Sequence, residues 1–430
     1  MIETYKFRLY PTKEQEALLA KHFGTVRFVY NWALNYSQEQ YKKDKTYKGW
    51  MSIVVSDEFH QLKRDNPWMK ETGANSIINS IGHLGRAFDN FFERRSGFPK
   101  FKSKKQHKDS FEVPAGLKLD FKHEKIQIPK FLKQKKQDNR IKCVFSKKVK
   151  PGKIGTATIS RNPAGQYFIS FIVHTLEKET PLIDKSKLSK ENSLGIDFGL
   201  KHFLTLSNGK QIDSPEFFKK TLSKLKLRQR QFSKTKSDSK NHEKMRIKVA
   251  RIHNKITNQR KDFLHKLSTS IANDNQVSAV CIEDLNLEGM KKLWGRKVGD
   301  LSYYAFTQML GYKLKRRGKH LLKIGRFDPS SQLCSNCGNR QKLTLDERVY
   351  VCPKCGLSID RDLNASTNIR DFAIFRDVRK HSNTAATAGI NACGDGSSGS
   401  GCANCLNETT VCEARKIERR KRNTLKYSDI

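Results

Sequence analysis

The chain has 430 residues, of which 84 are lysine or arginine and 43 are aspartate or glutamate, so its formal net charge is +41. This length predicts two to four domains, and the cationic excess indicates a nucleic-acid partner, because binding releases the counterions condensed on a polyanion. No apolar run of about 18 residues occurs, and the N-terminal MIETYKFRLY lacks the apolar core of a signal peptide. We therefore expect a cytoplasmic protein, nucleoid-associated when bound to DNA, with no membrane partner.

The first part of the chain combines strand and helix patterns. Residues 1–10 alternate apolar and polar side chains, as in a half-buried strand, and Thr12 with Gln15 forms a capping-box start for a helix. Helical spacing follows, and strand-like alternation returns after it. We predict a small β-barrel or sandwich from residues 1–10 and 108–180, with a helical domain at 11–107 inserted between its first two strands.

The second part predicts an α/β domain at residues 193–380, preceded by a charged, aperiodic linker at 181–192. A basic helical hairpin is predicted from about Pro215 to Asn273, because its second arm carries apolar residues at helical spacing. The end of the chain is rich in glycine, serine, threonine and asparagine, which predicts a disordered basic tail at 381–430. Short apolar runs predict buried strands at Leu194–Phe198, Phe203–Leu206, Val277–Ile282 and Leu321–Ile324.

Three carboxylates stand where a buried strand ends or a helix begins. Asp197 and Glu283 each follow an apolar run, and Asp362 opens a predicted helix. If they converge, they could hold two magnesium or manganese ions about 4 Å apart, as two-metal phosphodiester hydrolysis requires. Singly, such residues are more often turn formers or helix caps, and we assign Asp284 and Asp360 to those roles. The joint occurrence of the other three favours a catalytic metal site.

These carboxylates lie in the motifs GIDFG (195–199), CIEDL (281–285) and DRDLNA (360–365). The motifs resemble the three RuvC motifs of the TnpB (OrfB) family, whose members are encoded by bacterial insertion sequences and are relatives of the type V CRISPR effectors. The resemblance extends from residue 1 to about residue 370. Further matching stretches are FRLYP (7–11), GFPKFK (97–102), and IHNKI (252–256) leading to RKDF (260–263).

The resemblance implies an α/β multidomain fold with a RuvC-like, RNase H-fold nuclease domain at 193–380 and Asp197, Glu283 and Asp362 as its catalytic residues. It also implies that the N-terminal part is a wedge-like β-domain with a helical recognition insertion. Guide RNA and target DNA are the implied partners, with base pairing selecting the DNA. Phe198 and Ser366 depart from the family pattern, but neither change removes a metal ligand. The predicted protein is an RNA-guided DNA endonuclease, which we expect to be monomeric.

Two C-x-x-C pairs are separated by fourteen residues and predict a zinc ribbon at 327–358, since each pair can present two thiolates to one tetrahedral ion. Four protein ligands leave no open position, so the zinc is expected to be structural. The alternative is a set of incidental buried thiols. The ribbon ends shortly before Asp362 and is expected to help position it. The predicted ligands are Cys334, Cys337, Cys352 and Cys355, whereas Cys393, Cys402, Cys405 and Cys412 are either a second metal site or free thiols.

Two cationic clusters could bind phosphates while nearby aromatic rings stack on bases, or could be ordinary solvated faces. Three rival functions remain open: a guide-loaded repressor that binds DNA without cutting, a transposase that joins DNA strands, and a non-catalytic zinc-ribbon scaffold. The cationic clusters are Lys100, Lys102, Lys104 and Lys105, and Lys313, Lys315, Arg316 and Arg317.

Overall fold

The computed structural model describes residues 1–47, 52–106, 109–114, 116–129, 140–286, 289–290, 292, 295, 299–326, 328–344 and 346–386. Most of the predicted tail, including Cys393, Cys402, Cys405 and Cys412, lies outside these residues. Among the helices in the described ranges, none is long and apolar enough to cross a membrane.

The N-terminal strand lies in the middle of a seven-stranded sheet with the order β2-β6-β7-β1-β5-β4-β3, whose strands pair antiparallel. Tyr5, Phe7 and Leu9 of β1 point to one face and are at most 2% exposed, which confirms the predicted alternation. The bounds are β1 Ile2–Tyr10, β2 Asp109–Val113, β3 Lys118–Asp120, β4 Lys125–Gln127, β5 Arg140–Val144, β6 Gly152–Arg161 and β7 Tyr167–Thr175.

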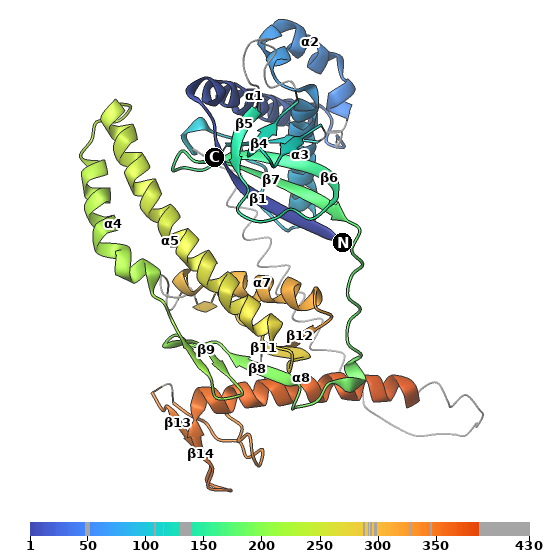
Figure 1. The fold of residues 1–430 in the computed structure, drawn as a ribbon, viewed down its shortest axis with the longest axis vertical. Helices are drawn as coiled ribbons and strands as arrows, with labels where there is room; N and C mark the ends of the chain where they lie inside the picture. The colour runs from blue at the N-terminus through green and yellow to red at the C-terminus, as the bar shows by residue number, and fades with distance from the viewer. Residues whose placement is uncertain are drawn as a thin grey trace, which may run out of the picture. The chain divides into compact units, whose positions relative to one another are not determined.

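The prediction of a closed barrel or a sandwich is wrong in its closure, because the sheet is a curled half-barrel (Figure 1). Its edge strands β2 and β3 are not paired with each other in the described residues. The apolar face is instead covered by helix α1 (Lys13–Lys43), whose Leu19, Phe23 and Val26 belong to the same core as β1. A helix that buries this face removes the need for the strands to close on themselves.

Helices follow β1 and precede β2 in the chain. The predicted capping box at the start of α1 is confirmed, since the Gln15 backbone N–H donates to Thr12 Oγ1 and the Thr12 N–H donates to Gln15 Oε1. The later half of α1 forms a second core with α2 (Asp57–Asp65) and α3 (Ala74–Phe92). This core is built from Val29, Leu34, Phe59, Ile77, Ile81 and Leu84, among others.

A second sheet has the order β10-β9-β8-β11-β12 and is mixed. Strands β8, β11 and β12 pair in parallel, whereas β9 pairs antiparallel with both β8 and β10. The four predicted strands and the helical hairpin are confirmed. The strands are β8 Ser193–Asp197, β9 His202–Leu206, β10 Gln211–Asp213, β11 Ala279–Glu283 and β12 His320–Ile324, and the helices are α4 Phe217–Ser233, α5 Lys240–Asn273, α7 Tyr303–Lys315 and α8 Arg361–Ala386.

Helices cover both faces of this sheet, and the side chains of β11 show how. Val280 and Ile282 pack in one core with α5 and α7, whereas Ala279 and Cys281 pack in another with α8. A strand that is buried on both faces has no polar side, which explains why this part of the sequence is a continuous apolar run.

The predicted linker at 181–192 is partly packed onto the second sheet and its helices. The Ile183 N–H donates to the Gly318 carbonyl at 2.7 Å, and Leu188 is buried beside α8 residues. A short 3-10 turn, Lys185–Lys187, lies between these two anchors. The lack of periodicity indicated an irregular segment, but it carried no information about these contacts.

Candidate active site

Asp197 and Glu283 lie at the same ends of two neighbouring strands. β8 and β11 pair in parallel with Ile196 opposite Ile282, so the next residue of each strand is the carboxylate. The ends of the two strands that carry Asp197 and Glu283 therefore lie side by side at one edge of the sheet.

Asp362 reaches the same edge from the first turn of α8. A Cβ atom added to Gly199 would lie 3.8 Å from Asp362 Oδ2, which places this carboxylate beside the turn that follows β8. The helix approaches β8 closely at Gly195, where an added Cβ would lie 1.9 Å from the Ser366 carbonyl oxygen. The glycine before Asp197 is thus needed for the helix carrying Asp362 to pack against the strand.

The electrostatics of this edge favour binding of cations. Burial, followed by the negative charges of Asp362 and Glu283, raises the pKa of Asp197 to about 8. The pKa of Glu283 is also raised, first by burial and then by Asp328 and Asp284. Within the described part of the chain, none of the three predicted ligands has a salt-bridge partner. The charge of Arg361 lowers the pKa of Asp197 only in part, and a divalent metal ion would neutralise such a group of carboxylates.

Of the neighbouring acids, Asp360 has the helix-cap role predicted for it, whereas Asp284 forms an ion pair in place of the predicted turn or cap. Asp360 Oδ1 accepts hydrogen bonds from the backbone N–H groups of Asp362 and Leu363, each at 3.0 Å, and so caps the start of α8. Asp284 forms an ion pair with Arg326 at 3.2 Å. Both carboxylates are therefore occupied by contacts that explain them without catalysis.

Tyr303, which was not predicted as a site residue, supports the turn after Asp197. Its hydroxyl donates to the Gly199 carbonyl oxygen at 2.6 Å, and its ring stacks on Phe203 with centroids 5.5 Å apart. Burial raises the pKa of this hydroxyl, so it remains a hydrogen-bond donor at neutral pH. No motif marks Tyr303, because its partner is a backbone carbonyl from a distant segment.

The four predicted cysteines form one cluster, in which all the sulfur atoms lie within 4.8 Å of one another. The Cys334–Cys355 and Cys337–Cys352 sulfur distances are both 3.6 Å, close to the edge of about 3.8 Å expected for a tetrahedron with Zn–S bonds of about 2.3 Å. The three carboxylates do not form so tight a group. The donor set and the spacing therefore fit a single structural zinc ion.

The turns around the cysteines are built for metal binding. Gly338 and Gly356 have φ values of +73° and +71°, a left-handed conformation that favours glycine, and each follows a C-x-x-C pair. A backbone hydrogen bond from Leu357 is the largest of the contacts that lower the pKa of Cys355 to about 6, which favours its thiolate form. Strands β13 (Val349–Val351) and β14 (Ser358–Asp360) then lead directly into α8.

One of the predicted phosphate-binding cations has a different role. Lys313 is 8% exposed, and its Nζ donates to the His265 carbonyl, Ser268 Oγ and Thr269 Oγ1, each at 2.7 Å. The side chain joins α7 to α5 and has no donor left for a phosphate, so this part of the prediction is corrected. The other seven members of the two clusters are exposed.

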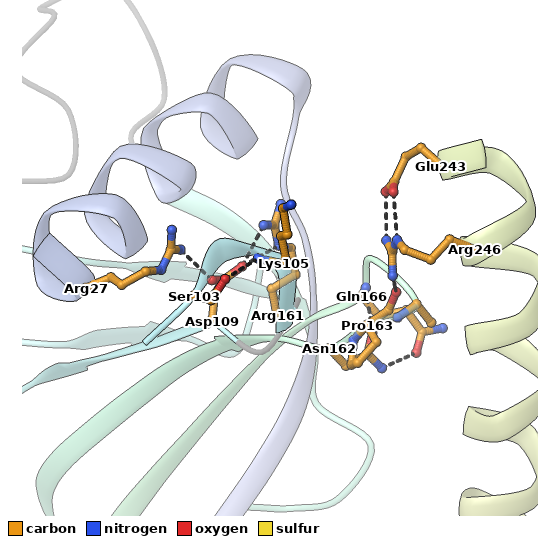
Figure 2. A network of polar contacts seen from close by, with 11 residues as sticks. Arg27, Ser103, Lys105, Asp109, Arg161, Asn162, Pro163, Gln166, Glu243 and Arg246 are labelled. Atoms are coloured by element: carbon orange, nitrogen blue, oxygen red, sulfur yellow. Dashed lines mark hydrogen bonds and ion pairs between the residues drawn. The ribbon is translucent and has the colours of Figure 1, made fainter. Parts of the chain in front are cut away.

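An open cavity of about 1110 Å³ lies beside Lys104 and Lys105, the turn at 162–164 and helix α5. Figure 2 shows how its walls are connected: Arg246 forms an ion pair with Glu243 and donates to the Pro163 carbonyl. Two of the predicted cations thus face a space large enough for a nucleic-acid strand. The α5 residues of this wall were missed, because amphipathic spacing shows which side of a helix is apolar but not what its polar side faces.

Known protein families match three parts of this chain. Three family models match: "Probable transposase" (OrfB_IS605) over residues 173–293, "Cas12f1-like, TNB domain" over 303–369, and "Helix-turn-helix domain" (HTH_OrfB_IS605) over 1–46. In this structure, residues 1–46 form strand β1 and the single helix α1.

Two curated relatives extend over most of the chain. A Streptomyces pristinaespiralis protein named "Putative RNA-guided DNA endonuclease" is 33% identical over 396 residues, 91% of this chain and 91% of that protein. The Escherichia coli K12 protein "Putative RNA-guided DNA endonuclease InsQ" is 28% identical over 386 residues, 86% of this chain and 91% of that protein.

A solved structure shares the fold. It is titled "Cryo-EM structure of the Cas12f1-sgRNA-target DNA complex", and its protein aligns with a TM-score of 0.52 and 15% identity over 86% of this chain and 98% of its own. The mixed α/β multidomain architecture described above is therefore a Cas12f-like fold.

Proposed function

Because this chain belongs to the TnpB (OrfB_IS605) family, we propose that it is an RNA-guided DNA endonuclease of an insertion sequence, with Asp197, Glu283 and Asp362 as its catalytic carboxylates. The observation that carries the proposal is that the ends of β8 and β11 and the start of α8 lie at one sheet edge, which supports the convergence of the three acidic side chains. The mixed sheet with helices on both faces supports a RuvC-like, RNase H-type nuclease domain.

Asp197, Glu283 and Asp362 would hold two magnesium or manganese ions, which supply a Lewis acid and an activated water for phosphodiester hydrolysis. Asp197 carries a proton near neutral pH when no cation is present, because its pKa is raised to about 8. It gives up this proton when a cation binds. Tyr303 holds the turn after β8, and the packing of α8 on Gly195 holds Asp362 in place.

Guide RNA and target DNA are the proposed partners. Two relatives are named for RNA-guided DNA cleavage, and the complex that shares the fold contains a guide RNA and target DNA. The net charge of +41 supplies the attraction to polyanions. We place one nucleic-acid contact at Lys104 and Lys105, which face the open cavity. The cysteine cluster would hold structural zinc.

The test is cleavage by the full-length protein purified with its bound RNA. Sequencing that RNA identifies the guide, and a plasmid carrying the complementary sequence serves as substrate. Asp197→Ala should reduce cleavage by more than about 100-fold, since even outer-shell partners of metal ligands contribute 10- to 100-fold. Asp213→Ala is the matched control, because this carboxylate lies on β10 of the same sheet and its side chain is 84% exposed.

Three outcomes would contradict the proposal. Cleavage that survives Asp197→Ala would remove the proposed site. Guide-dependent DNA binding without cleavage by the unaltered protein would indicate a repressor. The family description "Probable transposase" makes strand transfer the second candidate function. Products in which the cut end is joined covalently to another DNA would support that activity, and hydrolysis would not give them.

A further inference from the structure

Two buried asparagines connect α8 to the loop that carries the first cysteine pair. Asn364 and Asn368 are 0% and 5% exposed and lie four residues apart, on one side of the helix. No role was predicted for either residue from the sequence, although Asn364 lies within the third motif, DRDLNA (360–365). Buried side-chain amides require hydrogen-bond partners, and an unpaired group costs about 1–3 kcal/mol.

Both amides bond to backbone groups next to Cys334. Asn364 Nδ2 donates to the Leu333 carbonyl at 2.7 Å, and its Oδ1 accepts from the Ser335 N–H at 2.9 Å. Asn368 Nδ2 donates to the Ser330 and Leu333 carbonyls, each at 2.7 Å. We call these two residues the asparagine clamp. The clamp holds the backbone on both sides of Cys334 against the helix that begins with Asp362.

The second cysteine pair is connected to the same helix through the chain itself. After Cys355, strand β14 runs straight into α8. Arg361 reinforces the junction, since its N–H donates to the Arg348 carbonyl at 2.8 Å and its Nη1 to the Thr344 carbonyl at 3.0 Å. The start of α8 is thus held by the clamp on one side and by β14 on the other.

We propose that the metal ion of the cysteine cluster closes a ring that positions Asp362, with Asn364 and Asn368 as positioning residues. The ring runs from α8 through β14 to Cys355, across the ion to Cys334, and back through the clamp to α8. Its closure would fix the first turn of the helix relative to the ribbon, and the packing of α8 on Gly195 sets the helix against β8. This inference rests on the proposed role of Asp362 and extends it to residues that do not touch the catalytic ions.

The test uses Asn364→Ala and Asn368→Ala in the full-length protein with its RNA. Thr367→Ala is the control, because Thr367 lies between the two asparagines but bonds only within the helix, to the Leu363 carbonyl. Three quantities are measured: zinc per chain, hydrogen exchange of residues 361–365, and cleavage rate as a function of Mn²⁺ concentration.

Each clamp variant should keep one zinc per chain, exchange at 361–365 at least about tenfold faster, and need about 10- to 100-fold more Mn²⁺ for half-maximal cleavage. The rate at saturating Mn²⁺ should return to within severalfold of the unaltered protein, because all catalytic ligands remain. If Asn364→Ala does not fold, Asn364→Asp replaces it, since its Oδ1 can still accept from the Ser335 N–H.

The proposed role of the clamp would be overturned if both variants left hydrogen exchange of residues 361–365 and the Mn²⁺ concentration for half-maximal cleavage unchanged. A loss of rate that saturating Mn²⁺ does not restore would also overturn it, since that indicates general structural damage. Asp197→Ala is run in parallel. If it abolishes cleavage while the clamp variants have no effect, the ring is wrong and the active site stands. If Asp197→Ala has no effect on cleavage, the proposed function itself fails.

Discussion

In the metal-free protein, burial and two neighbouring acidic residues keep the Asp197 carboxylate protonated at neutral pH. Its burial and its two acidic neighbours raise its pKa to about 8, so below that pH the neutral form predominates in the metal-free protein. A cation can bind only the deprotonated form and must therefore displace a proton. Metal affinity is linked to pH for this reason.

The linkage predicts how the Mg²⁺ requirement depends on pH. The Mg²⁺ concentration for half-maximal cleavage should fall by up to about tenfold per pH unit between about pH 6 and pH 8, and then level off. The sign follows from the raised pKa, because raising the pH removes the competing proton. Cleavage titrations at fixed ionic strength provide the measurement, with Asp213→Ala expected to follow the unaltered protein. A requirement that does not change over this range would show that Asp197 does not bind the ion.

Single residues could be predicted where a local sequence pattern marks them. Residues that bond to a distant backbone group could not be predicted. Asp197 and Glu283 follow apolar runs, and the cysteines have metal spacing, so both sets could be recognised. Tyr303 and Asn368 bond to carbonyls of residues far away in the sequence. Lys313 resembled its exposed neighbours, because nothing local indicates that α5 buries it.

Among the elements, the α4–α5 hairpin and the neighbouring turn at 162–164 line part of the open cavity. Figure 2 shows the polar contacts between α5 and this turn. Arg246 and Asn254 of α5 hold this turn through the Pro163 carbonyl and Gln166 Oε1, at 2.8 Å each. These bonds occupy the side chains of Arg246 and Asn254. The exposed ammonium groups of Lys104 and Lys105 remain as the cations available to a phosphate backbone.

Reversing these two charges tests the cavity. Lys104→Glu with Lys105→Glu should weaken binding of the copurified RNA at low salt and reduce the slope of log K against log salt by about 1–2, because each phosphate contact contributes about 0.7–0.9. Lys104→Arg with Lys105→Arg keeps the charge and should bind as tightly as the unaltered protein. Filter binding over a series of salt concentrations measures both. Equal slopes for the two variants would exclude these lysines from the nucleic-acid surface.

Strands and helices were predictable where one face of an element is apolar, as in β1, β11 and α5. The closure of the first sheet was not predictable, because it depends on α1 packing on the same face. Alternation records which side chains are buried, and it does not say whether a helix or another strand buries them. The half-barrel in place of a closed barrel is an example of this limit.

For the whole molecule, the cationic excess and the motifs together favour a nucleic-acid enzyme, and the chain builds a separate core for each of its two large sheets. The N-terminal core builds a sheet covered by a helix, and the second core places acidic residues at a sheet edge. Neither charge nor hydrophobic pattern identifies the nucleic acid, so guidance by RNA depends on the family relationship.

The central claim is that Asp197, Glu283 and Asp362 together bind divalent cations. Anomalous scattering from crystals of the full-length protein soaked in Mn²⁺ tests it most directly. We predict manganese density about 2.1 Å from oxygens of these carboxylates, and its loss in Asp197→Ala crystals. Crystals of cleavage-competent protein with no manganese among the three carboxylates, at saturating Mn²⁺, would contradict the account.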